Sequence, residues 1–181
     1  MAHTQRGLTQ LQELLNERVH RNIDVDQDRC WQIVARLNEF DFEDAEEIAE
    51  IESSSDGSDA GQRMFIATLA GRPDMEMKLE WLDEIQQKKS PLPLARKRAA
   101  MHRLFPAHQQ NLHSQLAEDI LASLPKVSEA ASDSLLSSYS MLIPVFATGP
   151  CNDQLEKGIA NSSGLHPILA KRLRVAKQEN A

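Results

Sequence analysis

The spacing of apolar residues along the chain predicts α-helices over most of its length. Between residues 6 and 20, leucine and valine recur every three or four positions and place one apolar stripe on an amphipathic helix. A second helix is expected to begin at Asp24 or Asp26 and a third at Asp41, because an aspartate can cap the free N–H groups of a first turn. The predicted core contains these large apolar residues: Trp31, Phe65, Trp81, Leu82, Leu104 and Phe105.

Glycine and proline mark the boundaries of the later helices. Gly71 suits the left-handed position just past a helix, and Pro73 suits the first turn of the next helix, where no backbone N–H is needed. The last helix, over residues 166–178, carries Pro167 in its first turn. Four other prolines are expected to begin or end helices: Pro91, Pro93, Pro106 and Pro125. The pattern predicts about ten helices.

The connections between these helices are short, which favours antiparallel neighbours. We therefore expect a single all-α domain over residues 1–181, in which stacked antiparallel helix pairs form an α–α superhelix of the HEAT or armadillo type. No strict internal repeat is visible, so periodicity alone also allows a compact helical bundle.

Composition adds limits on where the chain resides. Apolar residues make up 41% of the sequence and the longest apolar runs are far shorter than the roughly 20 residues of a membrane span, so no span is predicted. The N-terminus does not resemble a signal peptide, and a cytoplasmic location is expected, with the cell envelope as the alternative. Cys30 and Cys151 form no CxxC motif and are expected to be buried thiols.

Charge is distributed unevenly over the net value of −7. Residues 1–90 contain twenty acidic and ten basic residues, whereas residues 91–181 contain seven acidic and ten basic ones. Ten acidic residues lie between Glu39 and Asp59 without one basic residue, which is typical of a solvated helix face. The acidic balance disfavours nucleic acid as the main partner.

The sequence offers no set of catalytic or metal-binding residues. His102, His108 and His113 are spaced six and five apart, which does not place two imidazoles on one helix face, and they are expected at the surface or at helix ends. HExxH, GxSxG and glycine-rich phosphate motifs do not occur. We therefore expect no active site, metal or cofactor within this chain.

Arginines in the second half are candidates for binding a carboxylate, because the guanidinium can donate two parallel hydrogen bonds. Solvent exposure is the alternative interpretation. The candidates lie on the two most basic helices: Arg98, Arg103, Arg172 and Arg174.

Several short motifs follow one another along the chain in an order that is similar to that in a known domain. They are Asp26…Arg29-Cys30-Trp31…Leu37, Glu52…Asp56-Gly57-Ser58-Asp59-Ala60-Gly61, Ala70-Gly71-Arg72-Pro73-Asp74…Lys78…Trp81-Leu82, Pro91-Leu92…Arg98-Ala99-Ala100-Met101…Leu104-Phe105-Pro106…Gln109, Leu116-Ala117-Glu118-Asp119-Ile120-Leu121…Leu124-Pro125 and Lys171-Arg172-Leu173-Arg174…Gln178-Glu179. In order and spacing they resemble the C-terminal helical domain of the zinc aminopeptidases typified by aminopeptidase N.

The resemblance implies a superhelix that closes the catalytic cavity of a larger peptidase and controls which peptides enter. Its partners would be the catalytic domain of the same polypeptide and peptide substrates, and the zinc would lie in that catalytic domain. The family's HExxH zinc helix, GxMEN loop and catalytic tyrosine have no counterpart here, so this chain is expected to be inactive alone. Residues up to Ala181 end in a helix without a stop signal, which suggests an excised fragment. The alternative is an independent helical-repeat scaffold that binds a protein or peptide.

Overall fold

The computed structural model describes residues 4–20, 23–87, 90–145 and 150–179. Within these ranges the protein is all α, apart from one antiparallel pair of two-residue strands, β1 (Val19–His20) and β2 (Ile23–Asp24). The described residues form eleven α-helices: α1 (Gln5–Glu17), α2 (Gln27–Glu39), α3 (Ala45–Ser55), α4 (Asp59–Ala70), α5 (Met75–Gln86), α6 (Leu94–Arg103), α7 (Gln110–Gln115), α8 (Ala117–Ala130), α9 (Asp133–Tyr139), α10 (Pro150–Ala160) and α11 (Pro167–Glu179). Short 3-10 helices connect some of them: η1 (Ala107–Gln109), η2 (Ser140–Leu142) and η3 (Ser162–Gly164).

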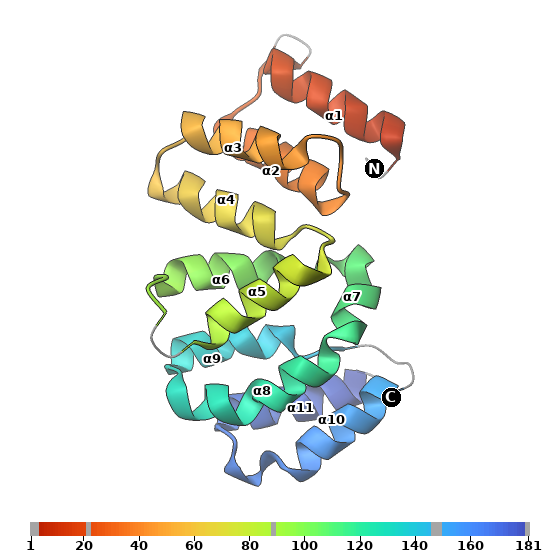
Figure 1. Cartoon of the computed structure of the whole chain (residues 1–181), viewed down its shortest axis with the longest axis vertical. Helices are drawn as coiled ribbons and strands as arrows, with labels where there is room; N and C mark the ends of the chain where they lie inside the picture. Colours follow the sequence, from red (N-terminus) through yellow and green to blue (C-terminus); the bar gives the residue numbers. More distant parts are fainter. Residues whose placement is uncertain (1–3, 21–22, 88–89, 146–149, 180–181) are drawn as a thin grey trace.

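The helices are stacked in chain order along the long axis of the molecule, from α1 at one end to α10 and α11 at the other (Figure 1). Successive layers are in contact: α2 packs on α1, α3 and α4, α4 packs on α6, α6 packs on α9, and α10 packs on α8 and α11. The expected all-α stack of helix pairs is therefore confirmed. The expectation that residues 1–181 form a single domain stays a prediction.

Side-chain caps explain where several helices begin, and one predicted cap is wrong. Asp26 accepts a hydrogen bond from a backbone N–H in the first turn of α2 (2.8 Å), as predicted. The third helix does not begin at Asp41 but after Asp44, which has a positive φ of 59° and makes no side-chain cap bond. Here the backbone N–H of Phe42 donates to Leu37 O (3.0 Å), and the resulting tight turn buries the Phe42 ring. Burial of an apolar ring therefore decides the start of α3.

Gly71 adopts a right-handed conformation, with φ −76° and ψ −11°, so the predicted left-handed cap is wrong. A Cβ at this position would lie 3.3 Å from Thr68 O and 3.5 Å from Arg103 O. The tight contact is thus with a carbonyl of α4 itself, while the contact with the end of α6 is an ordinary one, and no positive φ requires the glycine. Pro73 precedes the next helix instead of lying in its first turn, because Asp74 supplies the cap of α5.

Pro125 lies inside α8 and does not end it, contrary to prediction. A proline in a helix interior loses one backbone hydrogen bond and costs about 3 kcal/mol. The helix continues because its inner face buries several residues on both sides of the proline: Ile120, Leu121, Leu124 and Val127. Pro167, in contrast, opens α11 as predicted.

The buried apolar residues form two clusters. The N-terminal cluster contains Leu8, Leu15, Cys30, Trp31, Ile33, Val34, Leu37, Phe42, Ala45 and Ala49. The C-terminal cluster begins at Ala70 in the last turn of α4 and continues to Ala176 in α11. Partly buried residues of α4 pack against both clusters, with Met64 and Phe65 on the first and Ile66 on the second. Helix α4 therefore lies at the boundary between two separate apolar interiors.

Half of the predicted core residues are fully buried: Trp31, Leu82 and Leu104. The other three are only partly buried, which corrects the prediction: Phe65, Trp81 and Phe105. Phe105, for example, packs against the C-terminal cluster from outside its buried members, and its ring stacks on the His113 ring (4.2 Å between centroids). Cys30 is buried as expected, and the side chain of Cys151 lies outside the described residues.

Candidate functional site

The four candidate arginines are distributed over different places in the stack. Arg103 Nη1 donates to Glu39 Oε1 (2.5 Å), and Arg172 Nη1 donates to Glu179 Oε2 within α11 (3.0 Å). Arg174 is exposed two positions further along α11, and two such positions do not share a helix face. Two of the four cations are thus already paired with carboxylates, and the role of all four in peptide binding stays a prediction.

Arg98 is the candidate with the most suitable surroundings. It is exposed and lines a hollow of about 150 Å³ between α6 and α9. The other lining residues are Met101, His102, Ser137, Ser138 and Met141. A guanidinium, an imidazole and the Ser137 hydroxyl can donate hydrogen bonds, whereas the Ser138 hydroxyl already donates to Ser134 O (3.2 Å). The hollow therefore offers donors suited to a carboxylate.

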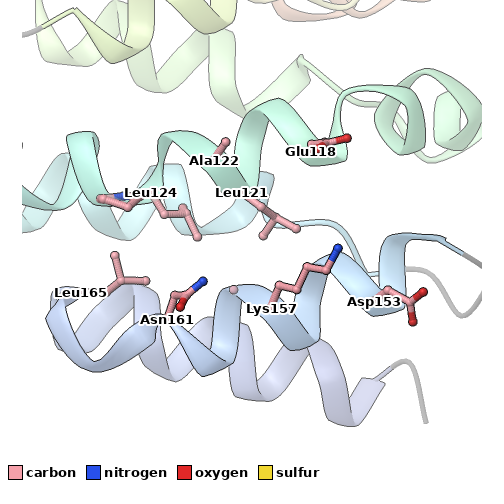
Figure 2. A pocket seen from close by; sticks show the side chains of 10 residues that line it. Glu118, Leu121, Ala122, Leu124, Asp153, Lys157, Asn161 and Leu165 are labelled. Carbon is pink, nitrogen blue, oxygen red and sulfur yellow. The ribbon is translucent and has the colours of Figure 1, made fainter.

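A larger groove of about 420 Å³ lies between α8 and α10, and Figure 2 shows its lining side chains. Leu121, Leu124 and Leu165 provide apolar surface, while Lys157 of α10 and Asn161, directly after α10, extend toward α8. Glu118 and Asp153 lie together at one end of the groove. The sequence did not predict this groove, because its two walls come from α8 and α10, which are not consecutive along the chain.

Two features of the local sequence build the groove. Pro150 opens α10, where its missing N–H costs no intrahelical bond. Gly158 then faces the leucines of the neighbouring helices, and a Cβ there would make ordinary contacts, 3.7 Å from a Leu173 methyl group and 4.0 Å from a Leu121 methyl group. The absence of a side chain at Gly158 leaves the floor of the groove open beside Lys157.

An apolar floor with a polar rim suits binding of an aliphatic side chain, with Asn161 and Lys157 available to peptide oxygen atoms. Groups with shifted pKa values lie elsewhere in the described residues. Burial raises the pKa of Tyr139 and lowers the pKa of His113 to about 4. Burial also lowers the pKa of Lys78 to about 7.

The acidic run is mostly exposed, as predicted, but the interpretation as a solvated face is wrong for two of its members. Glu39 and Glu52 are buried, with exposed fractions of 5% and 2%. Glu52 accepts hydrogen bonds from Arg18 Nη2 (2.8 Å) and Gln27 Nε2 (2.5 Å), and Glu39 accepts from Arg36 and Arg103. A buried carboxylate needs such partners, because an unpaired buried charge is strongly unfavourable.

The histidines are also only partly as predicted. His102 and His108 are exposed, and the His108 ring stacks on Phe40 (4.2 Å between centroids). His113 is partly buried and its Nε2–H donates to Leu142 O (2.7 Å).

In the part of the chain that the structure describes, no three His, Cys, Asp or Glu side chains are grouped so that they could hold a metal ion. No helix among these residues is both long and apolar enough to cross a membrane.

Comparison with known proteins leaves the family open: neither a protein-family model nor a curated protein sequence matches this chain.

Proposed function

We propose that this chain is the non-catalytic C-terminal helical domain of a zinc aminopeptidase similar to aminopeptidase N. In that role it closes the peptide cavity and restricts which peptides reach the catalytic domain. The zinc would be held by the catalytic domain and would polarise the scissile carbonyl there. The residues of the present chain would confine the peptide.

One observation carries the proposal: residues of the resemblance make the polar contacts between helices. Trp31 Nε1 donates to Asp56 Oδ2 (2.8 Å), which joins α2 to the turn before α4. Gln109 Nε2 donates to Gly71 O (2.8 Å), which joins the segment after α6 to the end of α4. Glu52 binds α1 and α2 to α3 through the bonds described above. Such contacts fix the angle between helices, so a chain with the same residues in the same order is expected to share the superhelix.

The identity of the parent protein can be tested on the endogenous polypeptide. An antibody raised against the purified chain would be used to isolate it from its cells. We expect a polypeptide much larger than 20.3 kDa that releases N-terminal amino acids from peptides and loses this activity with a zinc chelator. The purified 181-residue chain serves as the control and should neither bind zinc tightly nor release amino acids. An endogenous product of about 20 kDa without this activity would refute the proposal.

The Arg98 hollow provides a sharper test within the intact enzyme. A peptide whose N-terminus lies at the zinc must place its C-terminal carboxylate elsewhere, and Arg98 has donors beside it in an open hollow. Arg98→Gln is expected to raise KM for long peptides about fivefold, which corresponds to the roughly 1 kcal/mol of a partly exposed charge pair. Single-residue chromogenic substrates are too short to reach this domain and should be unaffected.

Arg29→Gln is the matched control, because Arg29 is an exposed arginine in the N-terminal half. It should leave KM unchanged for both substrate lengths. Equal effects of Arg98→Gln on long and short substrates would exclude a role in binding the peptide carboxylate. Arg103 and Arg172 should matter less than Arg98, because Glu39 and Glu179 already neutralise them.

The groove between α8 and α10 favours a second candidate function, an independent scaffold that binds an aliphatic peptide segment. Its volume lies within the range of about 300–1,000 Å³ that is common for ligand pockets. If the endogenous product is a short protein without peptidase activity, this function becomes the better one. Changing Ala122, an exposed residue of the groove lining, to Asp should then abolish binding of an aliphatic peptide, whereas changing the exposed Lys126 to Gln should not.

A further inference from the structure

The two apolar clusters meet at a polar junction in the middle of the stack, where the ends of α2 and α4 face α5, α6 and the segment before α7 (Figure 1). We define the junction by five residues: Glu39, Gly71, Lys78, Arg103 and Gln109. Gln109 Nε2 donates to Glu39 O (3.1 Å) and to Gly71 O (2.8 Å). Arg103 Nη1 donates to Glu39 Oε1 (2.5 Å). Polar bonds therefore join the ends of α2 and α4 to the segment before α7, beside the apolar contact of α4 with α6.

Hydrogen bonding at the junction is incomplete. Over the described ranges, four buried side-chain atoms have no hydrogen-bond partner: Asn38 Oδ1, Thr68 Oγ1, Arg72 Nε and Gln109 Oε1. Asn38 precedes Glu39 in α2, and Thr68 and Arg72 lie on either side of Gly71. All four atoms thus belong to the junction or to the adjoining turns. A region with unmet hydrogen bonds gains more from hydration than a dry apolar core does, which favours opening at this place.

Two buried lysines show how the junction differs from its surroundings. Lys97 Nζ donates to three backbone carbonyls at the end of α5: Glu84 O (2.9 Å), Ile85 O (3.3 Å) and Gln87 O (3.2 Å). Lys78 is completely buried, and among the described residues its Nζ donates one hydrogen bond, to Ala70 O (2.8 Å). An ammonium group has three donors. Burial lowers the pKa of Lys97 too. Its charge is nevertheless compensated by three acceptors, whereas a charge on Lys78 is compensated by one.

The groups that face Lys78 come from several helices. Burial lowers the pKa of Lys78 to about 7, and the carboxylates of Glu39 on α2 and Asp74 before α5 oppose this shift only in part. Nζ lies 5.6 Å from the centroid of the Phe105 ring, on which His113 of α7 stacks, and burial lowers the pKa of His113 to about 4. Glu39 is already engaged by Arg36 and Arg103 and is not available as a direct partner of Lys78.

We propose that the junction is a hinge between residues 5–70 and residues 75–179, and that it is loose when Lys78 carries a proton and tight when Lys78 is neutral. The inference applies to either proposed function, since both require a stack of defined shape. In the open arrangement, water reaches Lys78 and the four unpaired atoms around the junction. In the closed arrangement, a neutral amine donating to Ala70 O is compatible with a dry environment.

The direction of the pH dependence follows from the depressed pKa. In the open state Lys78 has its ordinary pKa of about 10.5, so above about pH 7 the open state binds a proton that the closed state does not. Raising the pH above 7 therefore stabilises the closed state by about tenfold per pH unit. Below about pH 7 both states are protonated and the opening equilibrium becomes independent of pH.

Hydrogen exchange read by mass spectrometry on the full chain tests this directly. Protection factors, corrected for intrinsic exchange rates, would be measured from pH 5.5 to 9. For backbone amides of α5 and of residues 103–115 we expect a constant value up to about pH 6.5 and a rise of about tenfold per unit above pH 7.5. Amides inside α2 and α8 should not follow this profile. Small-angle scattering should show a larger radius of gyration at pH 6 than at pH 9.

Four variants separate Lys78 from the other groups. Lys78→Met should give high protection without pH dependence, and Lys78→Arg should give low protection at every pH because arginine stays charged. Lys97→Met is the matched control and should retain the wild-type profile. His108→Gln removes the neighbouring imidazole and should also retain the wild-type profile. A flat wild-type profile, or an equal rise throughout the chain, would overturn the proposal. A local rise without a change in scattering would exclude hinge motion.

Discussion

The N-terminal region, from α1 to the first turns of α4, and the C-terminal region, from α5 to α11, fill their interiors with different polar groups. In the N-terminal region the buried carboxylate of Glu52 is held by Arg18 and Gln27. In the C-terminal region the buried Tyr139 hydroxyl bonds to Ser123 Oγ (2.7 Å) and to Gln86 Nε2 (2.9 Å). The first network is ionic and the second is neutral, so these two networks depend on different forces, while the C-terminal region also buries Lys78 and Lys97.

The apolar interiors differ as well. Within the described residues the N-terminal cluster has ten buried members and the C-terminal cluster has twenty. The smaller cluster is organised around one large side chain, Trp31, which is 1% exposed. A small core with an ionic polar network is expected to be less stable than a large core with a neutral one, because a buried ion pair adds little net stability. The comparison predicts that the N-terminal region unfolds first.

Trp31→Ala should have the largest effect and is the most direct test of the predicted difference in stability between the two regions. Removing a buried tryptophan costs about 3–5 kcal/mol, and here it also removes the hydrogen bond to Asp56. Trp81 is then the remaining tryptophan, since the chain contains two, and its fluorescence reports on the C-terminal region. In a urea titration we expect ellipticity to be lost in two steps and Trp81 fluorescence to change in the second step.

Wild-type protein and Trp81→Ala are the controls for this titration. Trp81 is only partly buried, so its loss should cost less than that of Trp31. If ellipticity and fluorescence coincide in Trp31→Ala, the two regions unfold as one cooperative unit. That outcome would support the expectation of a single domain and contradict the ranking of the two regions.

Local patterns in the sequence were sufficient for the helices but not for the polar interior. The amphipathic spacing located the helices, and the Asp26 cap fixed the start of α2, because both depend on residues within one or two turns. Glu39 and Glu52 were misassigned as solvated because their partners are distant along the chain. Arg103 lies 64 residues from Glu39, and Arg18 lies 34 residues from Glu52. An ion pair over such a separation leaves no local signal.

The errors at α3 and Pro125 have a related cause. Burial of Phe42 in the turn before α3, and of the inner face of α8 around Pro125, outweighs the local preference for a cap or a break. The surroundings of the candidate sites could not be predicted from local patterns either. The Arg98 hollow needs Ser137 and Ser138 from α9, and the groove needs α8 and α10 together. Arg98 itself was predictable from charge, but its suitable neighbours were not.

Two double-mutant cycles would compare the coupling energies of the ionic and the neutral network. We expect Arg18→Met and Glu52→Gln to show a coupling energy of about 1–3 kcal/mol, below the value for a fully buried pair because Arg18 is 44% exposed. The matching cycle of Tyr139→Phe and Ser123→Ala should give about 0.5–1.5 kcal/mol, as for a neutral hydrogen bond. Unfolding free energies from urea titrations provide both numbers. A larger coupling energy between Tyr139 and Ser123 than between Arg18 and Glu52 would contradict the prediction that the ionic network has the stronger pairwise interaction.

The smallest expected effect concerns two helical glycines, one in each region. Glycine inside a helix is less favourable than alanine by about 0.5–1 kcal/mol, so Gly158→Ala in α10 should raise the free energy of unfolding by that amount. The new methyl group would make ordinary contacts at 3.7 Å and 4.0 Å with leucine methyl groups.

Gly61→Ala in α4 should have the opposite sign, because its Cβ would lie 2.3 Å from the backbone oxygen of Asp56. The backbone cannot yield there without disturbing the Asp56 side chain that binds Trp31, so the N-terminal region loses stability. Melting temperatures of the two variants, measured side by side, check the prediction. Equal signs would mean that the turn before α4 can relax, and that the N-terminal region is less constrained around Trp31 than its contacts indicate.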